Sequence, residues 1–152
     1  MKFFYKKGIT AIEILIVTAI IGILAAVVLP QFSKIRENQI LENTTEEILS
    51  TINKTRSETM ASIDSSEYGV HFESDKVIIF KGETFSVEDV NNQIVEIVSP
   101  IVISDIDLSE GASEFYFDKL NGAPSAAGSV TVSSPSASRV ITISATGTAS
   151  AN

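Results

Sequence analysis

The sequence predicts an α+β protein in which one long N-terminal helix packs on a mostly antiparallel β-sheet. Three observations lead to this fold class. Residues 9–29 form an unbroken apolar run, and residues 31–63 mix apolar and charged side chains at helical spacing without Gly or Pro. Short alternating segments separated by turn residues then follow to the end of the chain. A long helix followed by several strands is an α+β arrangement.

The apolar run from Ile9 to Leu29 has the length of a membrane-spanning helix. Its 21 residues contain one charge, Glu13. At about 1.5 Å rise per residue they form a helix roughly 31 Å long, close to the thickness of a bilayer core. Positive charges beside a membrane segment stay on the cytoplasmic side. We therefore expect a single-pass protein whose domain after Pro30 faces outward, because three lysines precede the run: Lys2, Lys6 and Lys7.

Two other interpretations of residues 1–30 explain less. A secretory signal has an apolar stretch of roughly 7–15 residues and a small-x-small cleavage site, whereas this run ends in LPQF. A plain anchor explains the length but not Glu13, because a carboxylate near the bilayer centre costs roughly 2.5–3.5 kcal/mol. Such a charge indicates a functional site unless it lies near the headgroups, where it costs little. Glu13 alone leaves these two alternatives open.

The string KKGITAIEILIVTAIIGILAAVVLP, residues 6–30, resembles the N-terminal signature of type IV prepilins and type II secretion pseudopilins. That family has a short basic leader ending in Gly, an apolar first mature residue and Glu at the fifth mature position. These features fall on Gly8, Ile9 and Glu13, although Phe or Met is usual where this chain has Ile9. The resemblance implies that prepilin peptidase cuts between Gly8 and Ile9, that Ile9 is N-methylated, and that Glu13 pairs with the terminal amine of a neighbouring subunit.

The same resemblance implies an organisation and a location. Residues 1–8 are the leader, 9–30 a transmembrane and filament-core helix, 31–63 its amphipathic continuation and 64–152 a β-rich domain. The protein would lie in the bacterial inner membrane, with its C-terminal domain in the periplasm or outside the cell. Its partners would be membrane lipid, prepilin peptidase, an inner-membrane assembly platform and other pilin-like subunits. Gly22 and Pro30 either kink the helix, or Pro30 only marks the membrane exit.

The amphipathic segment predicts that the helix continues from about Thr10 to Ile63. We expect its apolar stripe to pack on the domain's own sheet. The stripe consists of Ile35, Leu41, Ile48, Leu49, Ile52, Met60 and Ile63.

Alternation and turn residues predict the strands. A turn at Ser74-Asp75 joins the first two, and the SSPSAS turn joins the last two. Cleanly alternating Val140–Ser144 predicts a strand with one buried face. The Ala, Gly and Ser-rich segment 121–138 and the tail TGTASAN are expected to be mainly surface loops. The predicted strands are 68–72, 76–81, 94–103 with a break at Pro100, 114–117, 129–132 and 139–145.

The closing segments EFYFDKLNG, GSVTVSS and SRVITISATG resemble the end of the GspH/FimT type of minor pseudopilin. In that group a Phe and a Gly precede a hairpin that ends in an I-x-I-x-x-x-G motif. The corresponding residues here are Phe117, Gly122, Ile141, Ile143 and Gly147. The absence of cysteine agrees with this resemblance, because many major pilins close their C-terminal region with a disulfide.

Charge and residue types exclude several functions. Residues 31–152 contain 8 Lys and Arg against 18 Asp and Glu, so we expect no binding of nucleic acid. His71 is the only histidine and lies in a predicted strand. Asp105, Asp107 and Glu110 could gather around calcium, but their spacing is not that of an EF-hand and favours a solvated acidic loop. We expect no metal site, no cofactor and no catalytic residues.

These expectations converge on a structural function. We expect a minor pilin or pseudopilin of a type IV pilus-like or type II secretion filament. A major pilin subunit and a DNA-uptake pseudopilin are the alternatives within the family. A membrane-tethered enzyme is the alternative outside it.

Overall fold

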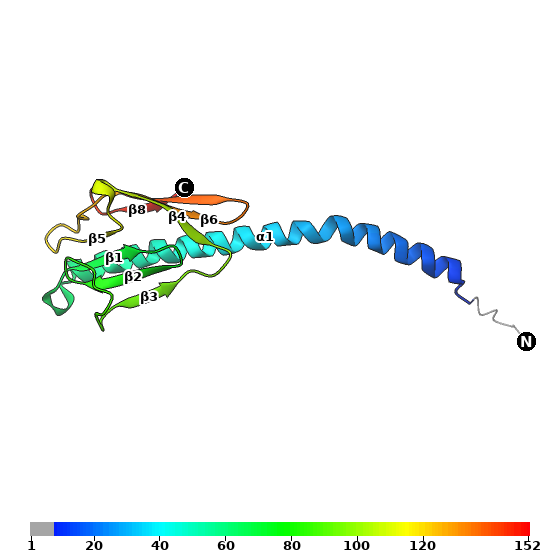
Figure 1. Ribbon diagram of the computed structural model, residues 1–152, viewed down its shortest axis with the longest axis horizontal. Coiled ribbons are helices and arrows are strands. Elements are labelled where there is room, and N and C mark those ends of the chain that lie inside the picture. The colour runs from blue at the N-terminus through cyan, green and yellow to red at the C-terminus, as the bar shows by residue number, and fades with distance from the viewer. Residues whose placement is uncertain (1–7) are drawn as a thin grey trace, which may run out of the picture. The chain divides into compact units, whose positions relative to one another are not determined.

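The computed structural model of the protein describes residues 8–152 (Figure 1). The three lysines of the expected leader lie outside the described residues. The chain divides into two compact units, Met1–Arg36 and Glu37–Asn152. A single helix, α1 (Ala11–Met60), belongs to both units. The remaining elements all lie in the second unit: η1 (Ile63–Ser65), β1 (Tyr68–Phe72), β2 (Lys76–Lys81), β3 (Gln93–Glu96), β4 (Val102–Leu108), η2 (Ser109–Gly111), β5 (Glu114–Tyr116), β6 (Gly128–Ser133), β7 (Ser138–Ile143) and β8 (Ala149–Ala151).

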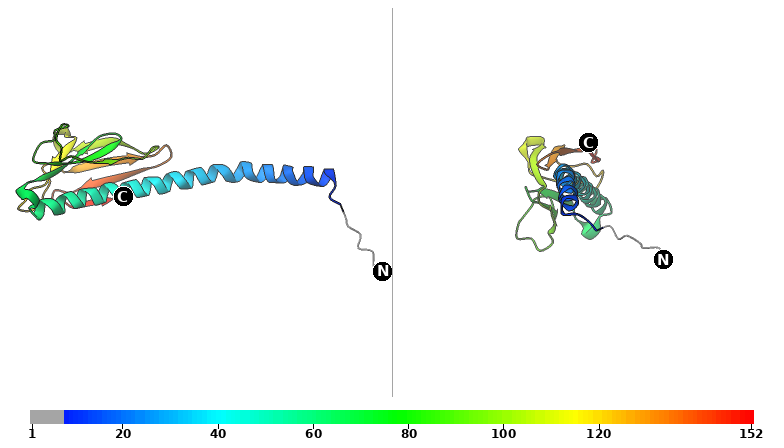
Figure 2. Two further views of the ribbon diagram at one scale, coloured as in Figure 1. Left: turned by 90° about the horizontal axis from the view of Figure 1, so that it is seen from below. Right: turned by 90° about the vertical axis from the view of Figure 1, so that its right-hand side faces the viewer.

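The α+β fold class is confirmed, but the strands form two sheets rather than the single expected one. Their orders are β3-β2-β1-β5 and β4-β6-β7-β8, and every pairing is antiparallel. Residues 94–103, which we predicted to form one strand, instead contain the point at which the chain passes from the first sheet to the second. β3 ends at Glu96 in the first sheet and β4 begins at Val102 in the second. Figure 2 shows the strands beside the C-terminal part of α1.

One hydrophobic core joins the helix to both sheets. Leu41, Ile48 and Ile52 of α1 are buried in it, as predicted. The residues at the two ends of the predicted stripe are not buried: Ile35, Met60 and Ile63 are 53%, 50% and 45% exposed. The sheets contribute Val70 and Phe72 of β1, Val77 of β2, Ile103 and Leu108 of β4, Phe115 of β5, Val130 and Val132 of β6, and Ile141 and Ile143 of β7.

Threonines complete the buried face of α1, which the apolar pattern did not indicate. Thr45, Thr51, Thr55 and Thr59 are buried, and each hydroxyl donates to the carbonyl four residues earlier, over 2.7 to 3.0 Å. A buried hydroxyl is costly unless it is hydrogen-bonded. Here the helix itself supplies the acceptor, and the threonine methyl groups are free to pack on the sheets.

Two segments that we expected to be loops are strands. Asp105 and Asp107 lie in β4, where their exposed side chains alternate with the inward-facing Ile106 and Leu108. The tail residues 149–151 form β8, which pairs with β7. The hairpin of β6 and β7 is confirmed, and so is the buried face of β7. The helix ends at Met60, before the predicted end at Ile63, because Ser62 and Asp64 take left-handed backbone angles.

We predict that Thr59→Val destabilises the unit 37–152 more than Thr55→Val does. Both side chains are fully buried on the same face of α1. Only the Thr59 hydroxyl also accepts a hydrogen bond from another element, from the Tyr68 N–H over 3.1 Å. Leaving that donor unpaired should lower the free energy of unfolding by about 1–3 kcal/mol. Chemical denaturation of the detergent-solubilised chain measures both variants, and equal losses would contradict the prediction.

Candidate functional site

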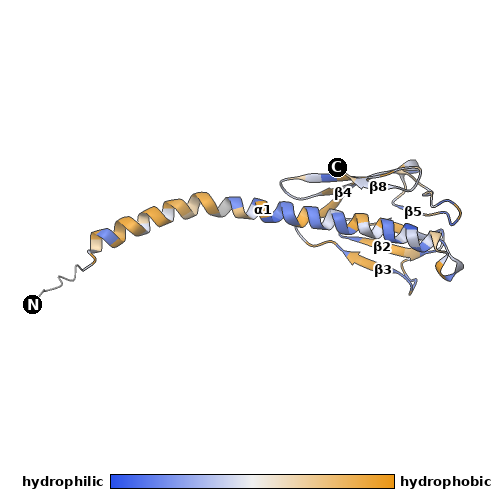
Figure 3. Ribbon diagram, turned by 180° about the vertical axis from the view of Figure 1, so that it is seen from behind, coloured by the Kyte–Doolittle hydropathy of each residue, from blue (hydrophilic) through white to orange (hydrophobic). Residues whose placement is uncertain are grey.

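The apolar N-terminal helix is the candidate functional site, because its side chains are exposed. Its most apolar 18-residue window has a mean hydropathy of 2.9, and none of that window is buried. The large apolar side chains between Ile9 and Val28 are 46–75% exposed. Figure 3 shows the ribbon of this part of α1 coloured almost entirely as hydrophobic. The helix is long and apolar enough to cross a membrane.

Glu13 lies at the start of α1 and forms a capping box with Thr10. The Glu13 N–H donates to Thr10 Oγ1 over 3.4 Å. In return, Glu13 Oε2 accepts hydrogen bonds from the Thr10 N–H over 3.4 Å and from the Thr10 hydroxyl over 3.3 Å. These contacts satisfy donors at the first turn of the helix, where a carboxylate is also favoured by the helix dipole. The pattern T-A-I-E could have revealed this box from the sequence.

The surroundings of Glu13 are apolar apart from two threonines. A shallow groove beside it is lined by Ile9, Ile14, Val17 and Thr18. The Thr18 hydroxyl donates within its own helix, to the Ile14 carbonyl over 2.9 Å. Within residues 8–152 no Lys, Arg or His forms an ion pair with Glu13. The carboxylate is therefore open to a cation from outside the described chain.

The other residues singled out near the N-terminus lie as follows. Gly8 and Ile9 precede the helix and have no regular secondary structure. The helix continues through positions 22 and 30 without a break in its assignment. Nothing lies within 4 Å of the place where a side chain at Gly22 would begin. No contact within the described residues explains the glycine at this position.

Arg56 of α1 joins the two C-terminal glycine loops, which the sequence analysis did not anticipate. Its Nε donates to the Gly122 carbonyl over 2.9 Å, and its Nη2 donates to the Thr146 carbonyl over 3.2 Å. Gly122 and Gly147 have φ angles of 64° and 82°, which favour glycine. A side chain on Gly147 would also collide with the Gly122 carbonyl. The two loops therefore meet at Arg56 only because both glycines are present.

The structure gives each residue of the closing motif a structural role. Phe117, Ile141 and Ile143 are at most 1% exposed and lie in the core. Gly122 and Gly147 form the junction at Arg56. The sequence motif thus consists of three core residues and two loop residues.

His71 holds the connection between β2 and β3 against the first sheet. Its ring stacks on Phe85 with the centroids 4.1 Å apart, and its Nδ1 lies 2.9 Å from Glu114 Oε2. The other Glu114 oxygen accepts from the Phe85 N–H over 3.2 Å. Among residues 8–152, no three His, Asp or Glu side chains lie together as metal ligands would.

Two side chains of the second unit have shifted pKa values with local causes. Burial raises the pKa of the Tyr68 phenol, and the nearby Asp64 carboxylate adds to this shift. Hydrogen bonds from the backbone and the side chain of Asn91 lower the pKa of Asp89.

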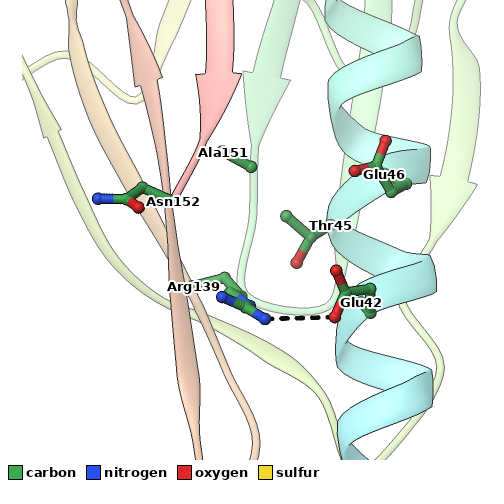
Figure 4. Close-up of a pocket in the computed structure, with 6 residues that line it drawn as sticks. All are labelled: Glu42, Thr45, Glu46, Arg139, Ala151 and Asn152. Atoms are coloured by element: carbon green, nitrogen blue, oxygen red, sulfur yellow. Dashed lines mark hydrogen bonds and ion pairs between the residues drawn. The ribbon is translucent and has the colours of Figure 1, made fainter.

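A polar hollow separates α1 from the end of the second sheet (Figure 4). Arg139 Nη2 lies 3.2 Å from Glu42 Oε2 across it. The Thr45 hydroxyl donates its hydrogen bond within the helix, to the Leu41 carbonyl. An exposed ion pair of this kind contributes at most about 1 kcal/mol. The hollow is lined by Glu42, Thr45, Glu46, Arg139, Ala151 and Asn152.

Acidic groups greatly outnumber basic ones in the second unit. Residues 37–152 contain 18 Asp and Glu but only 6 Lys and Arg. All of these basic side chains already bind acceptors within the unit. The domain therefore has no free basic patch of the kind that nucleic acid requires.

Comparison of the chain with protein-family models, with curated proteins and with solved structures finds no match. The architecture itself is pilin-like, since an N-terminal hydrophobic helix continues into a domain of antiparallel sheets.

We predict that Arg56→Met loosens both glycine loops. Methionine keeps much of the apolar stem but donates no hydrogen bond, so the carbonyls of Gly122 and Thr146 lose their partner. The free energy of unfolding should fall by about 1–3 kcal/mol. Hydrogen exchange should accelerate at the amides of Gly122 and Gly147, which donate within the two loops.

Lys54→Met is the matched control for this experiment. Lys54 lies two residues away on the same helix, and half of its side chain is exposed. Its Nζ lies 3.8 Å from Glu58 Oε1 and donates to Gln93 Oε1 over 2.9 Å. Such a pair contributes little, so this variant should unfold within about 0.5 kcal/mol of the wild type. Equal effects of the two substitutions would mean that the Arg56 hydrogen bonds do not hold the loops.

Proposed function

We propose that the protein is a minor pilin or pseudopilin, a structural subunit of a type IV pilus-like or type II secretion filament. Prepilin peptidase cuts it between Gly8 and Ile9, Ile9 is methylated, and the mature chain assembles through α1. The observation that carries this proposal is an exposed apolar helix whose one carboxylate, Glu13, lacks a cation within the described residues.

The exposed helix supports assembly because its apolar side chains are unfavourable in water, so lipid or other protein must cover them. Fully burying a large aliphatic side chain is worth about 1.5–3 kcal/mol. Lipid covers these side chains while the helix is in the membrane. Helices of neighbouring subunits can cover the same side chains in a filament, so the helix can pass from the bilayer into a filament core.

Glu13 supports the proposal through its charge. A carboxylate buried among apolar helices is costly unless a cation pairs with it. Cleavage after Gly8 creates a suitable cation, the amine of Ile9. When a neighbouring subunit supplies this amine, both charges are neutralised inside the filament. The chain that supplies the amine must be processed for this pair to form, and the pair therefore links processing to assembly.

The location and the partners follow from this proposal. The chain is a single-pass protein of the bacterial inner membrane, and residues 37–152 lie in the periplasm or outside the cell. Its partners are membrane lipid, prepilin peptidase, an assembly platform and other pilin-like subunits. The function is structural, with no catalytic step of its own. A major pilin would use the same helix, whereas the acidic domain does not favour DNA uptake.

We predict that Glu13→Ala and Glu13→Gln both block entry into filaments. Both variants lose the negative charge, but glutamine can still cap the helix with Thr10. Both should insert into the membrane and be cleaved as the wild type is. Their amount in filaments sheared from cells, relative to the membrane fraction, should fall by at least tenfold. Quantitative mass spectrometry of the two fractions measures this ratio.

Glu47→Gln is the control for the loss of one negative charge, because Glu47 is exposed in the second unit and forms no ion pair there. It should assemble normally. Normal assembly of Glu13→Gln would show that capping, and not charge, explains Glu13, and the proposed pairing would then be wrong.

We also predict the chemical form of the mature protein. Its intact mass should correspond to residues 9–152 with one methyl group on the amine of Ile9. A chain that keeps its leader in cells that make filaments would contradict the proposed processing.

A further inference from the structure

The bond between Gly8 and Ile9 lies outside helix α1. Residues 8–10 have no regular secondary structure, and the helix begins at Ala11. Ile9 is 75% exposed, and nothing lies within 4 Å of the place where a side chain at Gly8 would begin. The bond that we propose for cleavage is therefore open on all sides within the described chain.

Thr10 is the residue immediately before helix α1 and caps its first turn. Its Oγ1 accepts a hydrogen bond from the Glu13 N–H over 3.4 Å, and its carbonyl oxygen accepts from the same N–H over 3.2 Å. An N-cap side chain replaces the carbonyl that a preceding helical turn would supply, and its own backbone is not helical. The apolar run starts earlier, at Ile9, so the apolar residues alone do not explain why the helix begins at Ala11.

An open, non-helical bond matters for hydrolysis. The cut requires water oxygen to add to the Gly8 carbonyl carbon. The carbon–nitrogen bond then breaks, and the Ile9 nitrogen gains a proton and becomes an amine. In a helix that carbonyl would accept a hydrogen bond from a later turn and would be enclosed by neighbouring side chains. If the bond lay in a helix, the helix would have to unwind before cleavage, and only the unwound fraction of chains could bind the peptidase.

We infer that Thr10 is a positioning residue for leader cleavage, because its hydroxyl keeps the Gly8–Ile9 bond extended and accessible to the peptidase. The inference rests on the proposed processing. The inference predicts different effects for substitutions at Thr10 and at Glu13, because the group that donates to Thr10 Oγ1 is the backbone N–H of Glu13 and not its carboxylate. Glu13→Ala keeps this hydrogen bond and should still be cleaved, whereas removal of the Thr10 hydroxyl abolishes it.

The experiment measures kcat/KM for cleavage of the full-length precursor in detergent by purified prepilin peptidase. Thr10→Val removes the hydroxyl and keeps the shape of the side chain. The loss of an N-cap corresponds to a decrease of roughly fivefold in kcat/KM. Thr10→Ser keeps the hydroxyl and should stay within about twofold of the wild type, since both residues cap well.

Thr18→Val is the matched control. Its hydroxyl donates inside the helix, to the carbonyls of Ile14 and Leu15. The same substitution there removes a hydroxyl from the apolar run without moving the helix start, so cleavage should proceed at the wild-type rate.

Each outcome decides between the two proposals. Failure of the wild-type precursor to be cut between Gly8 and Ile9 would overturn the proposed processing, and the role of Thr10 with it. Cleavage of the wild type and of Thr10→Val at equal rates would overturn only the role of Thr10. Equal slowing of the Val and Ser variants would overturn it too, because the hydroxyl would then not be the cause. Slowing of the Val variant alone supports both proposals.

Discussion

The rest of the structure depends on the two different surfaces of helix α1. Up to Val28 its large side chains are aliphatic and exposed, so this part must find lipid or other helices to cover it. From Leu41 to Thr59 one face is buried against two sheets and is built from aliphatic side chains and threonines. The hydroxyls of Thr45, Thr51, Thr55 and Thr59 are satisfied within the helix itself, so these side chains can pack on the sheets without leaving an unpaired hydroxyl. One helix can therefore be a domain core at one end and an assembly surface at the other.

Electrostatics acts differently in the two units. In the unit 37–152, every Lys and Arg is already bound to an acceptor, and the surplus charge is acidic and mostly exposed. Salt screens such charges within about 8–10 Å, so they contribute little attraction at longer range. Glu13 is a single charge among apolar side chains. Once lipid or protein covers this part of the helix, screening is weak and a partner for the carboxylate matters most. Under the proposed function, burial of the apolar helix would drive association, and pairing with Glu13 would select processed chains as partners.

Hydrogen bonds to the helix fix the C-terminal part of a chain that has no cysteine. Arg56 binds the carbonyls of both glycine loops, and Thr59 accepts the N–H at the start of β1. These bonds connect residues far apart in the sequence. They hold the ends of the strands to the helix, and glycine is needed where the two loops approach each other most closely.

The sequence by itself determined the features that depend on neighbouring residues. The length of the apolar run, the position of its one carboxylate, the T-A-I-E pattern and the alternation of β7 are all local patterns. SDIDL in β4 also alternates, but we interpreted this segment as a solvated acidic loop, and that prediction was wrong. Only the tertiary structure decided the features that depend on distant partners. β8 consists of Ala-Ser-Ala, which has no pattern of its own and becomes a strand only by pairing with β7. The division into two sheets, the burial of the threonines and the role of Arg56 likewise follow from packing, because each requires an acceptor or a neighbour that the local sequence does not contain.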